Sequence, residues 1–358
     1  MYYLYPDYYK KFHCIADKCI DTCCAEWQIV IDDESLEKYR NYKGDYRQTL
    51  CQNIDWEEGV FGHNKRGKCA FLRDDDLCDM YIHMGEDSLC TTCREYPRHT
   101  EEFENLREIT LSLSCPEVAK IVMNTTEPIT FVTKEDETDE CYEEFDYFLF
   151  SELEDVREEM IRIIQDRNVN IRDRIDKILQ IGVSVQRHYD AGSLISWNEF
   201  EESDRVCVEN EYELFERLFL FLFEEFEILY PQWAEVLVES RLFLFGEGKK
   251  VFEQNKEEFE TWWNTSNLTP LDIVLEQLVV YFISVYLLGA VYDENILGKV
   301  DACIGHTIEI YLLLLGRWLK HGELAMDDVI EVVYRYSREI EHSDENLERA
   351  EMLNWFAR

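Results

Sequence analysis

Nine cysteines in two stretches are the residues of this 358-residue chain whose type and spacing best suit chemistry. The first stretch holds Cys14, Cys19, Cys23 and Cys24, and the second holds Cys69, Cys78, Cys90, Cys93 and Cys115. Thiolates are soft ligands, and several of them at short spacing are the usual way to bind zinc or an iron–sulfur cluster. We therefore expect these nine cysteines to be metal ligands.

The number of metals is open, and the adjacent pair Cys23 and Cys24 shows why. Neighbouring side chains usually point apart, so one of the two thiols could serve a different site or none. Nine thiols could supply one four-cysteine cluster plus a zinc ion, or one metal with several cysteines that are not ligands. Packing alone is a poor explanation, because four cysteines fall between positions 14 and 24.

The sequence around these thiols shows few regular patterns of helix or strand. Residues 1–125 mix cysteines with turns and brief helical segments, so we expect a metal-binding domain with little regular structure. Metal would supply much of its stability. The clearest elements there are a helix from Glu34 to Asn53, capped by Asp33, and an extended segment at Ile109–Leu113.

The remainder of the chain indicates a different architecture. Residues 126–140 are polar and aperiodic, which predicts a linker, and residues 141–358 repeat apolar side chains at helical spacing. The predicted fold is therefore mainly α, with the cysteine-rich metal-binding domain attached to a larger, acidic all-α domain. The spacing predicts helices at 142–167, 170–190, 209–229, 231–245, 250–263, 270–292, 296–320 and 325–356.

Composition and charge limit the classes of binding partner and the cellular compartment that we expect for this protein. The net charge is −40, and a field of that sign repels nucleic acid and anionic lipid, so we expect neither as a partner. Attraction to a lysine-bearing protein and plain solubility both remain as reasons for the charge. The start has no signal pattern, and the longest uncharged stretch, Gln277–Tyr292, is short for a bilayer. We expect a cytoplasmic protein, where cysteines serve as ligands rather than disulfides.

A series of short motifs surrounds the cysteines. In order they are Phe12-x-Cys14, Cys23-Cys24-x2-Trp27, Cys69-x-Phe71-Leu72, Leu89-Cys90-x2-Cys93-Arg94-x-Tyr96-Pro97-Arg98 and Ser114-Cys115-Pro116-Glu117. This order resembles the flagellin lysine N-methylase family and, more widely, the YkgJ-like zinc- or iron-chelating proteins. The resemblance covers residues 1–120 with specific motifs, and the helical remainder agrees only in length and character.

The resemblance implies an enzyme that transfers methyl groups from S-adenosylmethionine to lysine side chains of flagellin, with a 4Fe-4S cluster held by its cysteines. Zinc could replace or accompany the cluster. The thiols shared with the pattern fall at Cys14, Cys19, Cys23, Cys24, Cys69, Cys78, Cys93 and Cys115, whereas Cys90 belongs to the narrower methylase-like form. Cys51, Cys141, Cys207 and Cys303 match nothing in it, and we expect packing residues there.

A methyl donor of this kind sets further requirements. Its sulfonium cation is stabilised by aromatic faces, so Trp27 and Tyr96 are candidate cofactor-binding residues. Arg98 could clamp the carboxylate of the donor, although Arg94 and Arg98 could instead offset the charge of a thiolate-bound cluster. A Tyr, Asp or Glu must accept the proton of the lysine, and the sequence does not single one out.

Two familiar enzyme patterns and one redox pattern do not fit. A radical S-adenosylmethionine enzyme would show C-x3-C-x2-C, and Glu26 stands where its third cysteine would be. A Rossmann methyltransferase would show a glycine-rich turn after a strand, whereas Gly246-Glu-Gly248 follows an apparent helix. The pair Cys90 and Cys93 lacks the βαβ frame of a thioredoxin-like site.

The main hypothesis is a cytoplasmic lysine N-methyltransferase that acts on flagellin or a similar protein. The alternative is a non-catalytic module in which zinc folds the first domain and the acidic helices bind a basic partner. Electron transfer through a cluster is a third, weaker interpretation.

Overall fold

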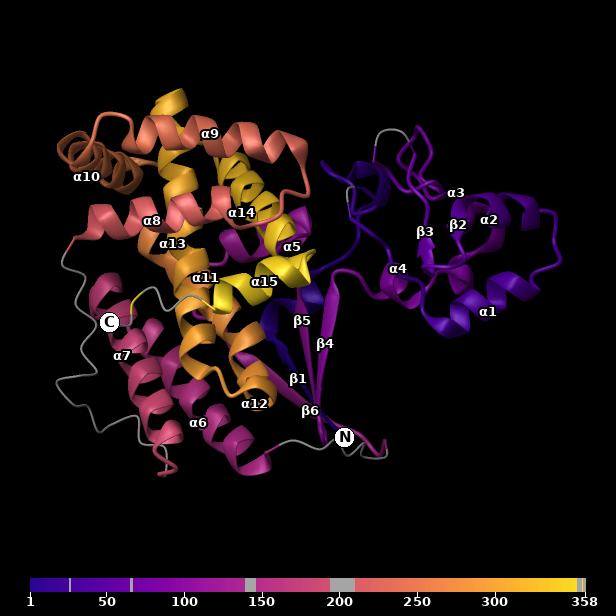
Figure 1. Ribbon diagram of the computed structural model, residues 1–358, viewed down its shortest axis with the longest axis horizontal. Coiled ribbons are helices and arrows are strands. Elements are labelled where there is room, and N and C mark those ends of the chain that lie inside the picture. The colour runs from indigo at the N-terminus through magenta and orange to yellow at the C-terminus, as the bar shows by residue number, and fades with distance from the viewer. Residues whose placement is uncertain (26, 65–66, 139–145, 194–209, 353–355, 357–358) are drawn as a thin grey trace.

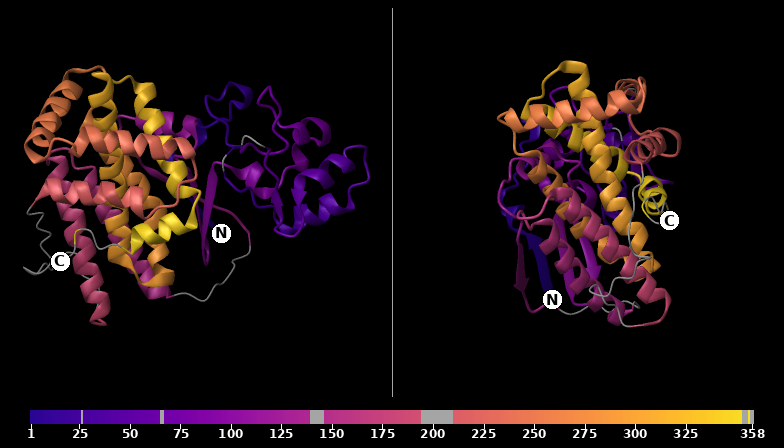
Figure 2. Two further views of the ribbon diagram at one scale, coloured as in Figure 1. Left: turned by 45° about the horizontal axis from the view of Figure 1, so that its top comes forward. Right: turned by 90° about the vertical axis from the view of Figure 1, so that its left-hand side faces the viewer.

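The computed structural model describes residues 1–25, 27–64, 67–138, 146–193, 210–352 and 356. The fold is mainly α, as predicted: a large helical body carries a small four-stranded sheet, and a smaller lobe projects from one side (Figure 1). The left-hand view of Figure 2 also shows the two parts side by side. The two parts also have separate hydrophobic cores.

Most helices of the body follow the predicted apolar spacing. The helices are α5 (Pro116–Met123), α6 (Tyr147–Ile164), α7 (Ile171–Asp190), α8 (Glu211–Glu224), α9 (Pro231–Phe245), α10 (Lys249–Thr265), α11 (Leu271–Tyr286), η5 (Leu287–Gly289), α12 (Ala290–Asp293), α13 (Ile296–His321), α14 (Met326–Glu341) and α15 (Asp344–Glu351). The single helix expected over 325–356 is wrong, because a new helix begins after Ser343, whose side chain accepts the Asn346 N–H. Helix α5 was not expected from the sequence. Local capping explains several starts, since Asn170 and Asn295 accept backbone N–H groups at the first turns of α7 and α13.

Helix α13 runs through the centre of the body and packs against α7, α9 and α11. Two stretches, Leu271–Asp293 and Ile296–His321, are long and apolar enough to cross a membrane. Their most apolar windows are 67% and 78% buried inside the protein, which is the behaviour of core helices. This agrees with the expectation for the uncharged stretch around α11.

The sheet has the strand order β4-β5-β1-β6, with β1 (Tyr2–Pro6), β4 (Arg98–Phe103), β5 (Leu106–Leu111) and β6 (Phe131–Glu135). Strand β1 pairs parallel with β5 and antiparallel with β6. The expected extended segment near Ile109 is therefore one strand of a larger sheet, and the region 126–140 contains an edge strand. A buried ion pair between Glu108 and Arg157, 2.5 Å apart, ties the sheet to α6.

The lobe contains α1 (Asp33–Asn41), α2 (Arg47–Asn53), the hairpin of β2 (Ile54–Asp55) and β3 (Val60–Phe61), α3 (Asp79–Met84), η3 (Glu86–Ser88) and α4 (Thr91–Glu95). The single helix expected over 34–53 is wrong, because the chain leaves helical geometry between Asn41 and Arg47. Its cap is Asp32, whose carboxylate accepts the Ser35 N–H at 2.9 Å, and not Asp33.

The two cores divide the chain differently from the expected boundary at residue 125. The lobe core gathers side chains from Ile29 to Cys90. Residues before and after this segment, such as Tyr8, Phe12 and Leu113, pack into the body core together with the helices. The chain therefore begins in the body, continues into the lobe, and returns to the body with strands β4 and β5.

Candidate metal centre

The nine candidate thiols lie in two groups that meet at Cys23 and Cys24. The first thiol group contains Cys14, Cys19, Cys23 and Cys115, whose thiols act electrostatically on one another. The second thiol group contains Cys24, Cys69, Cys78, Cys90 and Cys93, which are linked in the same way. The adjacent pair does not point fully apart, because Cys23 and Cys24 hydrogen-bond each other while their other neighbours differ.

Different elements supply the two groups. Cys14, Cys19 and Cys23 lie on the loops that follow η1 (Asp7–Lys11) and flank η2 (Ala16–Lys18), and Cys115 caps α5 of the body. The second group belongs to the lobe, where Cys69 donates its backbone N–H to the Cys24 carbonyl at 2.8 Å. The first group therefore lies where the loops meet the body, and the second lies in the lobe core.

The donor chemistry of both groups suits a soft metal. Each group holds at least four sulfurs, which is the number that a zinc ion or a 4Fe-4S cluster takes from protein. Among the described residues, no three His, Cys, Asp or Glu side chains are placed so that together they could hold a metal ion. The sulfurs of a group must therefore draw closer together before they share a metal.

Burial keeps several thiols protonated. It raises the pKa of Cys69 to about 12 and the pKa of Cys115 to about 11. Cys24 differs, because its hydrogen bond with Cys23, helped by Thr22 and the charge of Arg338, lowers its pKa to about 7. Since metals bind thiolates, loading of these groups must release protons.

Arg338 joins the first thiol group to the helical body. Its side chain is only 1% exposed and forms an ion pair with Asp21 at 3.1 Å, inside the loop between Cys19 and Cys23. It also donates to the carbonyl of Ser114, next to Cys115, and to the Tyr230 hydroxyl, both at 3.0 Å. Because the guanidinium touches both chain segments of the group, it supplies a fixed positive charge where thiolates gather.

Trp27 and Tyr96, the two aromatic candidates, lie together with a histidine that sequence reasoning missed. Their ring centroids are 5.9 Å apart, and His342 stacks on Trp27 at 4.5 Å. Both ring nitrogens of His342 are buried and make no hydrogen bond within the described residues. Burial and the charge of Arg338 lower the pKa of His342 to about 3, so its imidazole is neutral.

Arg98, the third candidate for binding the donor, faces another environment. Its Nε donates to the Tyr9 hydroxyl at 3.1 Å, and its guanidinium lies 5.4 Å from the ring centroid of Phe12. Both partners precede Cys14 in the chain. The described contacts of Arg98 thus place it beside the N-terminal segment, and its assignment to the donor carboxylate stays a prediction.

A chain of hydroxyl groups leads from Tyr96 into the body. The Tyr96 and Ser114 hydroxyls are 3.0 Å apart, Ser114 and Ser112 are 2.5 Å apart, and Ser112 donates to Glu341. Tyr281 also donates to this carboxylate, at 2.9 Å. Burial raises the pKa of Glu341. Such a chain can pass a proton between the phenol and the carboxylate.

The remaining cysteines were expected to be packing residues. Cys303 is buried in α13, as that expectation requires. Cys51 is exposed on α2, so the expectation is wrong for Cys51, because its position lies on the solvent side of that helix. Cys141 and Cys207 lie outside the described residues.

Comparison with known proteins finds the family in the helical body, so the expectation that this part agrees with the family only in length and character is wrong. Residues 157–356 match the model of the FliB lysine N-methylase C-terminal domain. A segment of 128 residues is 30% identical to the "Lysine-N-methylase" of Salmonella typhimurium and covers 33% of this chain and 32% of that protein. The "Lysine-N-methylase" of Salmonella choleraesuis matches to the same extent.

The "Flagellar biosynthetic protein FliU" of Salmonella muenchen is also 30% identical over 128 residues, which cover 75% of its length. The match thus spans about a third of the two methylases and most of the shorter protein. No solved structure matches this chain.

Proposed function

This chain belongs to the FliB lysine N-methylase family, and from that premise we propose that it is a lysine N-methyltransferase. The proposed methyl donor is S-adenosylmethionine, and the proposed substrate is flagellin or another lysine-bearing protein. The observation that carries the proposal is that the family-matched body packs directly on the first thiol group, through the contacts of Arg338 with Asp21 and Ser114. The first thiol group and the family-matched body therefore lie in direct contact, which supports a shared site.

Methylation requires the lysine to lose a proton before it reacts, because its pKa in water is about 10.4. The neutral amine nitrogen then bonds to the methyl carbon as the carbon–sulfur bond breaks, and the electron pair stays on sulfur. S-adenosylmethionine supplies this activated methyl group when it is bound. The hydroxyl chain from Tyr96 to Glu341 is our candidate acceptor of the lysine proton, since it ends on a carboxylate whose pKa burial raises.

We propose that both thiol groups hold soft metals, at least one of them as a 4Fe-4S cluster, with zinc as the alternative for the other. Cys14, Cys19, Cys23 and Cys115 would hold one metal group, and four of the five thiols of the second group would hold the other. Their contribution would be folding free energy for the lobe and a fixed position for the loop that carries Asp21.

Two features support a lysine-bearing partner. The net charge of −40 attracts basic proteins and steers their approach. Trp27, Tyr96 and His342 form an aromatic group beside the thiols, and aromatic faces favour cationic groups. The cytoplasmic location stays a prediction.

The direct test is to incubate anaerobically reconstituted full-length protein with methyl-labelled S-adenosylmethionine and purified flagellin. We expect label on lysine, identified by mass spectrometry of digested flagellin. Flagellin with chemically acetylated lysines is the control and should take up no label. Protein with intact metal that leaves untreated flagellin unlabelled would contradict the proposal. A colourless zinc protein that binds flagellin without labelling it would favour the non-catalytic module.

A further inference from the structure

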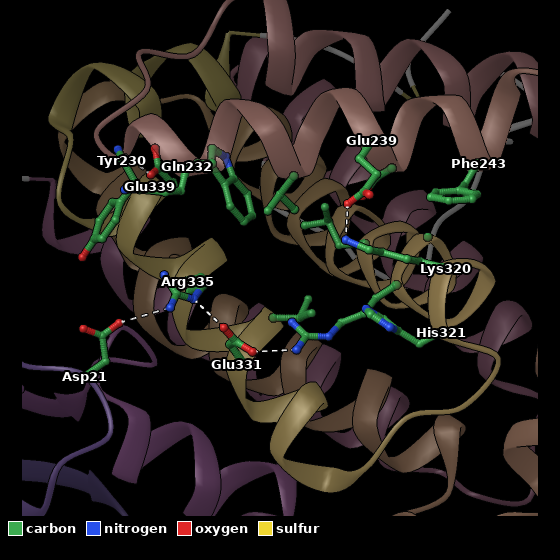
Figure 3. A pocket seen from close by; sticks show the side chains of 17 residues that line it. Asp21, Tyr230, Gln232, Glu239, Phe243, Lys320, His321, Glu331, Arg335 and Glu339 are labelled. Carbon is green, nitrogen blue, oxygen red and sulfur yellow. Dashed lines mark hydrogen bonds and ion pairs between the residues drawn. The ribbon is translucent and has the colours of Figure 1, made fainter.

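A cavity lies in the body beside the first thiol group. It has a volume of about 550 Å³ and is enclosed by α9, α13 and α14 (Figure 3). Cavities that bind small molecules measure roughly 300–1,000 Å³, so the space suits a ligand far larger than a lysine side chain. Nothing in the sequence motifs indicates this cavity, because its lining comes from the segment 230–245, from the helix pair α13 and α14, and from Asp21 near the start of the chain.

One face of α9 supplies the apolar wall. Trp233, Val236, Ser240 and Phe243 recur at intervals of three or four residues along this helix and all line the cavity. Trp233 is only 7% exposed, whereas Phe243 at 40% exposure stands at the opening. Two aromatic side chains on one wall suit a flat ring system such as a nucleobase.

The cavity lining also carries charges of both signs, on α13, α14 and α9. Arg335 lies 2.9 Å from Glu331, Arg317 lies 2.6 Å from the same carboxylate, and Lys320 lies 2.6 Å from Glu239 (Figure 3). A cavity with guanidinium and carboxylate groups facing one space suits a ligand that itself carries both charges. Guanidinium groups bind carboxylates in a bidentate manner, and carboxylates accept hydrogen bonds from ammonium and hydroxyl groups.

Asp21 connects this cavity to the thiols. Its side chain lines the cavity and lies 3.8 Å from Arg335 and 3.1 Å from Arg338. Its carbonyl accepts a hydrogen bond from the Cys19 thiol at 3.0 Å. The loop between Cys19 and Cys23 therefore forms one wall of the cavity, and a metal on the first thiol group would fix that wall.

We propose that this cavity is the binding site of S-adenosylmethionine, a zwitterion that joins a nucleoside to an amino acid. The inference rests on the proposed function and adds the location of the donor site, which replaces Trp27, Tyr96 and Arg98 as the residues expected to bind the donor. The adenine ring packs on Phe243 at the opening, Glu239 on the same helix accepts from the ribose hydroxyls, and Arg335 near Asp21 binds the α-carboxylate. This placement directs the amino-acid arm, which carries the sulfonium, toward Asp21 and the first thiol group.

A second cavity, of about 500 Å³, provides the comparison. It lies between α7, α8, α10, α11 and α13, and the described residues that line it all come from position 170 onward. No described residue of the cysteine-bearing segment reaches it. It has the size for the same ligand but lacks the link to the thiols.

The test measures binding of S-adenosylhomocysteine, the unreactive product, to full-length metal-reconstituted protein by isothermal titration calorimetry. Val236→Trp fills the first cavity from a position that is 40% exposed, so the variant should fold. Ile175→Trp fills the second cavity and is the matched control. We expect affinity to fall at least tenfold in V236W and to stay within twofold in I175W. Arg335→Gln, which removes a charge without adding bulk, should also weaken binding.

Hydrogen exchange gives a second readout that does not depend on variants. Bound S-adenosylhomocysteine should slow exchange of backbone amides in α9 and at the start of α14. Protection in α7 instead, or weaker binding in I175W with unchanged V236W, would overturn the inference. If V236W binds the ligand and methylates flagellin normally, the proposed donor site is wrong, while the proposed function still stands. Wild-type protein that neither binds the ligand nor methylates flagellin would overturn the proposed function, and the site with it.

Discussion

Arg338 is a buried cation whose contacts join the cysteine-bearing loops to the helical body. Its guanidinium bridges Asp21 on the loop between Cys19 and Cys23 with Ser114 on the segment before α5. A charge with 1% exposure is stable only while its partners are in place. The residue therefore couples the loop of the first thiol group to the packing of α14.

We predict that Arg338→Met lowers the free energy of unfolding by on the order of 3 kcal/mol, because Asp21 and the Ser114 carbonyl lose their partner. Arg338→Lys should recover part of this loss, since an ammonium keeps the charge but not the fork of donors. Urea unfolding at pH 7 measures both. Arg335→Met is the control: its side chain is 37% exposed, so the change should stay below about 1 kcal/mol. Equal losses in R338M and R335M would contradict this role.

His342 should make stability depend on pH. Its pKa is about 3 in the folded protein, below its ordinary value of 6.5, because burial disfavours the charged ring. As pH falls below 6.5, the unfolded chain takes up a proton that the folded protein does not, so stability present at pH 7 is lost. Between pH 7 and pH 5 we expect a loss of about 2 kcal/mol from this group.

Urea unfolding at both pH values, compared between the wild type and His342→Phe, isolates this contribution. Phe keeps a ring against Trp27 but cannot be protonated, so the variant should lose less stability on acidification. His13→Phe, a change at an exposed ring, should keep the wild-type slope. Parallel slopes for the wild type and H342F would show that the ring is not buried as a neutral group.

At the scale of elements, α14 faces the cysteine-bearing segments with one side. Arg335, Arg338 and Glu341 follow at intervals of three residues and contact, in turn, Asp21, the loop before Cys23, and Ser112. His342 directly follows the helix and stacks on Trp27. This single helix thus lines the proposed donor cavity, anchors the first thiol group and carries the end of the hydroxyl chain.

The split of the thiols between elements predicts two separable metal sites. Cys23→Ser should lower the metal content of the first thiol group, and Cys93→Ser that of the second, because the two thiols have different neighbours. Elemental analysis with visible and electron paramagnetic resonance spectra should show different losses in the two variants. Cys51→Ser, at an exposed thiol on α2, is the control and should keep all metal. Identical spectra and identical metal loss in C23S and C93S would favour a single shared site.

At the scale of the whole molecule, the lobe and the body have unequal cores. Among the described residues, the lobe core comprises twelve buried side chains, three of which are cysteines or methionine: Ile29, Ile31, Leu36, Tyr39, Tyr46, Leu50, Ile54, Phe61, Cys69, Phe71, Met80 and Cys90. The body core is far larger and continues through α13. A small core of this size needs additional stabilisation, which bound metal provides in many small domains.

Removal of metal should therefore unfold the lobe and leave the body folded. After anaerobic chelation we expect fast hydrogen exchange in α1, α2 and α3, with continued protection in α11 and α13. Circular dichroism should lose only the small share of helix that lies in the lobe. Loss of protection throughout α13 after chelation would show that the two cores unfold as one.

Local patterns predicted most of the body and little of the sheet. The apolar spacing of α9 and α13 predicted both helices to within one or two residues at their ends. Strand β6 was hidden within a polar stretch, because most of its side chains are exposed and its backbone is held by pairing with the distant β1. The break between α1 and α2 was missed because the apolar stripe continues across it.

By itself, the sequence determined a mainly α fold, nine candidate thiols and a motif order that resembles the lysine methylase family, since helical spacing and ligand spacing are local properties of the chain. Only the tertiary structure decided that Cys23 and Cys24 belong to different groups, that Arg338 and His342 are buried beside them, and that a cavity opens next to Asp21. These features depend on contacts between segments hundreds of residues apart. Local sequence patterns do not predict which charged side chains become buried when α14 packs in the fold.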